Sequence, residues 1–237
     1  MLTLVTGADT KYFNFLKQLL NNVIKISNIK NINIRIIVYN LGMNKNEIDE
    51  IKKISYVTLE SFNFDKYPEH VSLEKYNGFN CSYAWKPIII HEVCEKYGGL
   101  VHWIDTRCLY SNFTNMINIL KENYIYTPAS CGSVKRWTYP TTLEYMNGYK
   151  YQHLICRSGG IFGINYDIDW CKEFVEEWKN LALVKECICP ENSNRDNHRQ
   201  DQAVLTILFY KYLEKYNFKC INHNVDLSVH CKLLVEK

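Results

Sequence analysis

The stretch Gly98-Gly-Leu-Val-His-Trp-Ile-Asp105 joins a glycine pair to an apolar run that ends on a carboxylate. The segment before it, 83–97, is amphipathic and predicts a helix that ends at the glycine pair. The continuous apolar character of 100–104 predicts a strand that is buried on both faces, as in a parallel sheet covered by helices. Because ligands bind outside the carboxyl ends of such strands, Asp105 is a candidate site residue.

Strand-like and helix-like segments alternate along the rest of the chain. Strands are expected at 2–6, 31–39, 56–64, 100–104 and 124–128. Helices are expected at 11–26, 45–54, 83–97, 111–123 with Ser111 as cap, 167–182 and 200–216. Polar loops are expected at 65–80, 130–151 and 189–199, and long loops are often functional. This order predicts an α/β fold in one domain, residues 1–237, with no internal repeat or linker.

Composition narrows the class of partner. The chain has 237 residues, of which 47% are apolar and 22% charged, and its net charge is only +3. The densest basic segment is Lys135-Arg136-Trp137, which is too short for a nucleic-acid interface, so no nucleic-acid partner is expected. The 18 tyrosines are typical of carbohydrate and nucleoside sites. Abundant Asn, Ile, Lys and Tyr equally fit the codon bias of an AT-rich genome, such as that of a large DNA virus.

The ten cysteines are scattered, and several lie in apolar runs. The chain has no Cys-x-x-Cys, so we expect buried reduced thiols and no cysteine metal site. The first residues lack the basic start and apolar core of a signal peptide, and no apolar run approaches the roughly 18 residues of a membrane span. A soluble cytoplasmic location is therefore expected.

Several familiar sites are excluded by the absence of their motifs. There is no Gly-x-Gly-x-x-Gly and no Gly-Lys-Ser/Thr phosphate loop, which argues against dinucleotide dehydrogenases and P-loop enzymes. The segment His91-Glu-Val-Cys-Glu95 lacks the second histidine of a zinc protease helix. It is interpreted as an ordinary helix face.

The segment Thr6-Gly7-Ala8-Asp9 follows the first expected strand. Its glycine could let a ligand approach the backbone, and Asp9 could accept hydrogen bonds from a base or ribose. A plain turn with Asp9 as helix cap is an equal alternative.

Asp105 could hold Mn²⁺ or Mg²⁺ on a pyrophosphate, because carboxylate oxygens suit these ions. Its neighbour Arg107 stands where a second carboxylate would be convenient. Either another residue completes the site, with His230 as candidate ligand, or cationic side chains such as Lys232 replace the metal. The alternative is that Asp105 caps a turn.

Two further candidates lie in the second half of the chain. Asp201, followed by Gln202, opens a helix, and a carboxylate in the first turn is kept ionised by the helix dipole. It could receive a proton or hold sugar hydroxyls, although simple capping would also place it there. The run Ser158-Gly159-Gly160 precedes an apolar strand and permits close backbone approach to a ligand, or merely a tight turn.

In this order, the features resemble the glycosyltransferase A fold of the nucleotide-diphospho-sugar transferases, over nearly the whole chain. The resemblance implies a mixed, mostly parallel Rossmann-like sheet with helices on both faces. It matches Thr6-Gly7-Ala8-Asp9 to the nucleotide loop, Trp85-Lys86-Pro87 to a basic helix start near the donor, and His102-Trp-Ile-Asp105-Thr-Arg107 to the Asp-x-Asp metal motif. It also matches Ser158-Gly159-Gly160 to the strand beside the sugar, Asp201-Gln202 to the acidic helix start, and His230-Cys-Lys232 to residues that reach metal and phosphate.

One departure concerns Arg107, which replaces the second Asp of the Asp-x-Asp motif and puts metal dependence in doubt. The segment Tyr83-Ala-Trp-Lys-Pro87 also resembles a signature of uncharacterised domains in animals, nematodes and large viruses.

The resemblance implies a hexosyltransferase-like enzyme that moves a sugar from a nucleoside diphosphate donor, UDP-linked, to a hydroxyl of a glycan or glycoprotein. Asp105 and His230 would hold Mn²⁺ or Mg²⁺, and Lys86, Arg107 and Lys232 would offset phosphate charge. Asp201 would act as base in an inverting reaction or hold the donor sugar in a retaining one. The first alternative is a degenerate, non-catalytic sugar- or nucleotide-binding protein on the same fold. A nucleotidyltransferase ranks last, because only Gly7 follows the first strand where that class has a glycine-rich basic loop.

Overall fold

The structure, a computed structural model, describes residues 1–72, 75–76, 79–80 and 82–233. Its centre is a six-stranded sheet in the order β3-β2-β1-β6-β11-β8. These strands are β1 (Leu2–Ala8), β2 (Ile34–Asn40), β3 (Val57–Ser61), β6 (Leu100–Ile104), β8 (Ile125–Tyr126) and β11 (Ile161–Asn165). The pairs β3–β2, β2–β1 and β1–β6 are parallel, whereas β11 pairs antiparallel with both β6 and β8. The expected mixed, mostly parallel sheet is confirmed.

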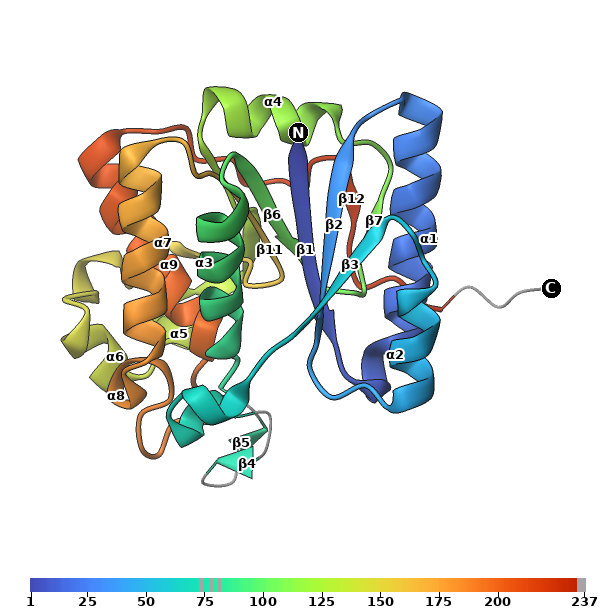
Figure 1. Cartoon of the computed structure of the whole chain (residues 1–237). Helices are drawn as coiled ribbons and strands as arrows, with labels where there is room; N and C mark the ends of the chain where they lie inside the picture. The colour runs from blue at the N-terminus through green and yellow to red at the C-terminus, as the bar shows by residue number, and fades with distance from the viewer. Residues whose placement is uncertain (73–74, 77–78, 81, 234–237) are drawn as a thin grey trace.

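Helices cover both faces of the sheet (Figure 1). They are α1 (Phe13–Lys30), α2 (Lys45–Lys52), α3 (Trp85–Tyr97), α4 (Thr114–Glu122), α5 (Val134–Trp137), α6 (Pro140–Tyr145), α7 (Asp169–Ala182), α8 (Lys185–Ile188) and α9 (Gln200–Tyr216). Alternate residues of β1 point to opposite faces, so Val5 packs in a core with α3, α7 and α9, and Leu4 packs in a second core with α1, α2 and α4. The strand β6 is buried throughout, as predicted. The helix α3 ends at Gly98 and Gly99, both with positive φ, which glycine adopts without strain.

Three small two-stranded sheets complete the fold. They are β9 (Ala129–Ser133) with β10 (Ile155–Arg157), β7 (Leu109–Tyr110) with β12 (Leu227–Ser228), and β4 (Lys75–Tyr76) with β5 (Phe79–Asn80). The last pair belongs to a predicted loop, 65–80, of which residues 73–74 and 77–78 lie outside the described residues.

The segment 130–151 is not the long loop that its composition predicts. It contains most of β9, the helices α5 and α6, and a 3-10 turn at 149–151. Helices of four and six residues are too short to show a helical period, and tertiary contacts hold them instead. The Thr142 hydroxyl donates a hydrogen bond to the Cys187 carbonyl (2.8 Å), which joins α6 to α8.

The helix α4 is not capped by Ser111. It begins at Thr114, and the carboxylate that serves its first turn is Asp226, 111 residues away from Asn115 in sequence. Asp226 accepts hydrogen bonds from the backbone N–H groups of Asn115 (2.9 Å) and Met116 (3.2 Å) and from the Asn115 side-chain amide (2.9 Å). The cap was hidden from local sequence analysis because it comes from the C-terminal segment.

This cap gives a direct prediction. Asp226→Ala should lower the free energy of unfolding by about 1 kcal/mol, the usual cost of losing a capping carboxylate. Ser111→Ala is the matched control and should leave stability unchanged. Urea unfolding followed by circular dichroism measures both variants, and equal midpoints would contradict the assignment of Asp226 as cap.

Arg157 in β10 ties the C-terminal segment to the sheet. Its side chain is fully buried, and its guanidinium donates to the carbonyls of Thr127 and Ile221 and to the Asn222 side-chain oxygen (2.6 Å). Within the described residues, no carboxylate forms an ion pair with this guanidinium. Backbone dipoles and the ring of Phe209, 4.6 Å from the guanidinium carbon, therefore stabilise the charge.

Among the helices in the described part of the chain, none combines the length and the apolar character that a membrane crossing requires.

Candidate active site

Three predicted site residues from distant parts of the chain meet at one end of the sheet. Lys86 lies in the first turn of α3, Asp105 directly follows β6, and Asp201 lies in the first turn of α9. The Lys86 ammonium is 3.3 Å from Asp105 Oδ1 and 3.2 Å from Asp201 Oδ2. It also donates a hydrogen bond to the Gly159 carbonyl (2.9 Å). We call Lys86, Asp105 and Asp201 the charged centre.

The two glycines between β10 and β11 make room for these carboxylates. A Cβ on Gly160 would lie 2.7 Å from Asp105 Oδ2, and one on Gly159 would lie 3.0 Å from Asp201 Oδ2. The Gly160 carbonyl also accepts a hydrogen bond from the Asp105 backbone (2.9 Å). The small residues were expected to admit a ligand or form a turn; here they contact both carboxylates.

Burial and charge act in opposite directions on the centre. Burial alone would lower the pKa of Lys86, but the carboxylates of Asp105 and Asp201 more than offset it and hold the pKa above its usual value. Burial raises the pKa of Asp201, the nearby charge of Asp105 raises it further, and Lys86 opposes both. Lys86 therefore favours the ionised form of Asp201, whereas burial and the charge of Asp105 oppose it.

The two carboxylates differ in access. The Asp201 side chain is 7% exposed, whereas that of Asp105 is 49% exposed. The Trp103 indole N–H donates to Asp105 Oδ1 (2.9 Å) and fixes its orientation. Trp103 was not predicted as a site residue; the signal was available, because it precedes Asp105 by two positions and so points to the same face of the strand.

The segment Thr6–Asp9, at the end of β1, lies at the same edge of the sheet as Asp105, because β1 and β6 are parallel. Its residues have different roles. The Asp9 carboxylate accepts a hydrogen bond from the Tyr12 backbone (3.0 Å) and caps a 3-10 turn. A Cβ on Gly7 would lie 2.8 Å from a methyl group of Leu41, so this glycine admits a core side chain. Thr6 and Ala8 are buried, and the Thr6 hydroxyl has no hydrogen-bond partner among the described residues. Asp9 thus caps a turn, as the alternative predicts, and its contact with a base or ribose stays a prediction.

Arg107 and the C-terminal segment lie toward α1. The Arg107 guanidinium stands 5.3 Å from the Phe15 ring, and its carbonyl accepts a hydrogen bond from the Cys231 backbone (2.9 Å). The Lys232 carbonyl accepts one from the Gln18 side chain (3.1 Å). In the described part of the chain, the side chains of His230 and Lys232 form neither a hydrogen bond nor an ion pair with Asp105.

The described residues do not fit a metal site as they stand. No group of three His, Cys, Asp or Glu side chains that could share an ion occurs in the described ranges. The Asp105 oxygen nearest Lys86 already receives that ammonium and the Trp103 N–H. A cation therefore already lies between the two carboxylates, and it is Lys86.

The remaining predicted residues border the centre. The Ser158 backbone donates to the Pro128 carbonyl (2.9 Å), and its own carbonyl accepts from the Thr127 hydroxyl (2.9 Å). The Gln202 backbone donates to the Arg199 carbonyl (2.9 Å), and its Cβ would lie 3.1 Å from a Cβ on Gly159. Both residues thus hold the turns that carry Gly159 and Asp201.

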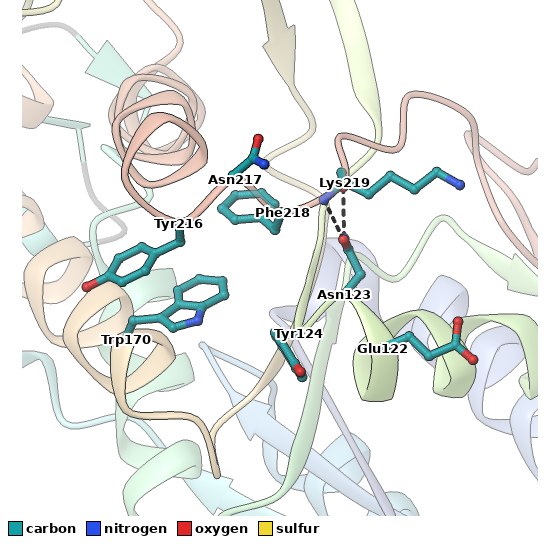
Figure 2. Close-up of a pocket in the computed structure, with 8 residues that line it drawn as sticks. All are labelled: Glu122, Asn123, Tyr124, Trp170, Tyr216, Asn217, Phe218 and Lys219. Carbon is teal, nitrogen blue, oxygen red and sulfur yellow. Dashed lines mark hydrogen bonds between the residues drawn. The ribbon is translucent and has the colours of Figure 1, made fainter.

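A recess of about 310 Å³ lies at the other end of α9 (Figure 2). Trp170 stacks there on Tyr216 and Phe218, with ring centroids 5.0 and 5.3 Å apart, and Asn123 exchanges two hydrogen bonds with the Lys219 backbone. The helix places Tyr216, at the edge of this recess, about 22 Å from Asp201, at 1.5 Å per residue. It therefore does not belong to the charged centre.

Comparisons with known proteins address the fold. The family described as "Protein of unknown function (DUF1647)" matches residues 2–91, which include the segment Tyr83–Pro87. No curated protein matches the chain. Among solved structures, the galactosyltransferase LgtC in complex with donor and acceptor sugar analogues matches with a TM-score of 0.57 and 16% identity, over 97% of this chain and 87% of LgtC. The bifunctional glycosyltransferase WbbM matches with a TM-score of 0.58 and 18% identity, over 89% of this chain but only 37% of WbbM. The chain therefore has the glycosyltransferase A fold.

Proposed function

We propose that the protein is a glycosyltransferase that uses a nucleoside diphosphate sugar, with UDP as the nucleotide, and a glycan or glycoprotein hydroxyl as acceptor. The observation that carries the proposal is the charged centre at the carboxyl end of β6, on a fold shared with glycosyltransferases. The fold places Lys86 within ion-pair distance of both Asp105 and Asp201, although 115 residues separate Lys86 from Asp201 in sequence.

The geometry suggests a division of roles. Asp105, half exposed, is the more accessible of the two carboxylates, and Trp103 and Lys86 fix its position. During transfer, the bond between the anomeric carbon and the diphosphate breaks and a bond to the acceptor oxygen forms. In an inverting reaction the acceptor proton passes to Asp201, and in a retaining one Asp201 holds the donor sugar. Lys86, Arg107 and Lys232 offset the charge of the leaving diphosphate.

Mn²⁺ or Mg²⁺, with Asp105 and His230 as ligands, stays a prediction. Bound to the diphosphate, such an ion would supply charge neutralisation. Because the donor set does not fit a metal site, the roles above are assigned to side chains alone.

Calorimetric titration of UDP into the purified protein, with and without Mn²⁺, is the test. Micromolar binding of UDP, with uridine much weaker, is expected because the cationic side chains act on the diphosphate. A requirement for Mn²⁺ would support the metal prediction, whereas indifference would assign diphosphate binding to Lys86, Arg107 and Lys232. Absence of UDP binding under both conditions would overturn the UDP assignment, and GDP would be titrated next.

One observation favours a second candidate, a non-catalytic binding protein on the same fold. Lys86 forms ion pairs with both carboxylates, and Arg107 stands where a second acidic residue would complete a metal motif. UDP binding without release of UDP from any UDP-sugar, in the presence of a broad set of acceptor glycans, would favour this candidate.

A further inference from the structure

Beside the charged centre lies a group of arginines that the proposed reaction does not use. Arg136 lies in the last turn of α5, Arg195 lies in the loop 189–199, and Arg199 directly precedes α9. We call these three residues the arginine cluster. The segments 133–137 and 194–199 also contain Lys135 and carry only one acidic residue, Asp196. The local net charge is thus as large as the +3 of the whole chain.

Among the residues that the structure describes, no carboxylate forms an ion pair that neutralises this charge, since none of their ion pairs involves Lys135 or any arginine of the cluster. His198 adds no charge, because burial lowers its pKa to about 4, and its Nδ1 accepts a hydrogen bond from the Tyr139 backbone (3.2 Å).

Each guanidinium is nevertheless held in place. Arg136 and Arg199 lie over the Trp137 ring, 4.3 and 4.0 Å from its centroid, and Arg136 donates to the Asp196 carbonyl (2.6 Å). Arg195 donates to the Tyr83 hydroxyl (2.7 Å). A fold that gathers and fixes like charges in this way gains stability when an anion binds them.

The backbone around the cluster is strained. Tyr83 and Gln200 have φ of 55° and 35°, a region that residues with side chains seldom adopt. Gln200 lies between Arg199 and Asp201 in sequence. Its side chain is buried, and its amide nitrogen has no hydrogen-bond partner among the described residues. Such strain is typical of sites where a fixed geometry serves a ligand.

The position of the cluster indicates the acceptor side of the site. Arg107 and the segment that carries Lys232 lie toward α1, next to the first strand, where the donor nucleotide is proposed to bind. The arginine cluster is carried by α5 and by the segment that leads into α9, and these elements lie on the other side of β6 from α1 (Figure 1). Arg199 and Asp201 are two residues apart, so their Cα atoms are separated by at most about 7 Å.

We propose that the arginine cluster binds an anionic group on the acceptor glycan, a carboxylate, sulfate or phosphate, on or next to the sugar that receives the transfer. Arginine forks bind the oxygen pairs of these groups with two parallel hydrogen bonds. This inference rests on the proposed function for the identity of the reacting hydroxyl, but the anion site itself does not require catalysis.

The test compares matched sugars by ligand-observed NMR titration. The probes are the methyl glycosides of glucuronic acid and glucose, galactose 6-sulfate and galactose, and mannose 6-phosphate and mannose, and their ranking identifies the anion. At least one anionic sugar is expected to bind tenfold or more tightly than its neutral partner. This preference should disappear in Arg195→Gln/Arg199→Gln. The matched control is Arg35→Gln, since Arg35 also lies 4.3 Å over an aromatic ring, Tyr97, but in β2 near its start.

The outcomes separate this proposal from the function. Equal affinity for charged and neutral sugars, with UDP binding intact, would overturn the anionic acceptor and leave the transferase. A preference for an anionic sugar in a protein that binds no nucleotide would support the cluster and overturn the transferase. Inorganic sulfate or phosphate that binds as tightly as the best anionic sugar would show a site for a free anion and overturn the proposal. The single variant Arg195→Gln, at an exposed position, serves if the double variant fails to fold.

Discussion

Lys86→Met should lower the free energy of unfolding by about 3–5 kcal/mol at pH 7, because it leaves the buried carboxylate of Asp201 without its cation. The Lys86 side chain is 5% exposed and that of Asp201 is 7% exposed, so water cannot replace the lost ion pair. Asp105 is half exposed, so water can solvate its carboxylate after the ion pair with Lys86 is lost. Urea unfolding monitored by circular dichroism measures the change.

The pH dependence of this loss has a definite direction. The pKa of Asp201 is already raised by burial, and removal of Lys86 raises it further above the unfolded value. The folded variant therefore binds a proton that the unfolded chain does not, so lowering the pH through this raised pKa makes the deficit shrink. The double variant Lys86→Met/Asp201→Asn should recover part of the lost stability for the same reason.

The matched control is Lys96→Met. Lys96 is exposed and pairs with Glu60 at 2.7 Å, so its ion pair is surrounded by water and should add almost nothing. A loss for Lys86→Met no greater than for Lys96→Met would contradict the buried charged centre.

Asp105→Ala should reduce turnover at least about 10²–10³-fold while the protein remains folded. The side chain is half exposed, so little buried area is lost, and Lys86 keeps its partner in Asp201. Release of UDP from a panel of UDP-sugars, with melting temperature measured in parallel, checks both parts of the prediction.

Asp167→Ala is the control for Asp105→Ala. Asp167 accepts a hydrogen bond from the Gly99 backbone (2.9 Å) at the opposite end of β6, so it probes loss of an aspartate beside the same strand. Its turnover should stay near that of the unmodified protein. Full activity in Asp105→Ala would refute the assignment of the active site.

The alternation of strands and helices could be predicted because long elements carry a period. Helices such as α1 and α9 repeat their apolar residues over several turns, and β6 is continuously apolar. Elements shorter than two turns, such as α5 and α6, show no period and were predicted as loop. The capping of α4 by Asp226 was equally invisible, because the two partners lie more than 100 residues apart.

The site was predictable as a set of positions and not as a set of contacts. Strand and helix ends placed Asp105, Lys86 and Asp201 at one edge of the sheet, since the carboxyl ends of parallel strands share that edge. The contacts depend on distances of a few ångström, which the sequence does not reveal. One lysine pairs with both carboxylates, and Gly159 and Gly160 make room for them. In the sequence, only the basic segment Lys135-Arg136-Trp137 indicates the arginine cluster. Arg199 is distant in sequence and lies over the Trp137 ring only in the folded chain.

The buried guanidinium of Arg157 has a consequence for the order in which the protein matures. Its acceptors at Ile221 and Asn222 follow it by 64 and 65 residues, so a partly folded chain in which the segment 220–222 has not yet docked holds a buried positive charge without these two acceptors. Such a chain can close its sheet only at a high cost in desolvation. Docking of the segment 220–222 is therefore needed before this charge can be buried at low cost, and a chain truncated before residue 220 should unfold at a lower urea concentration, even though the charged centre lies entirely upstream.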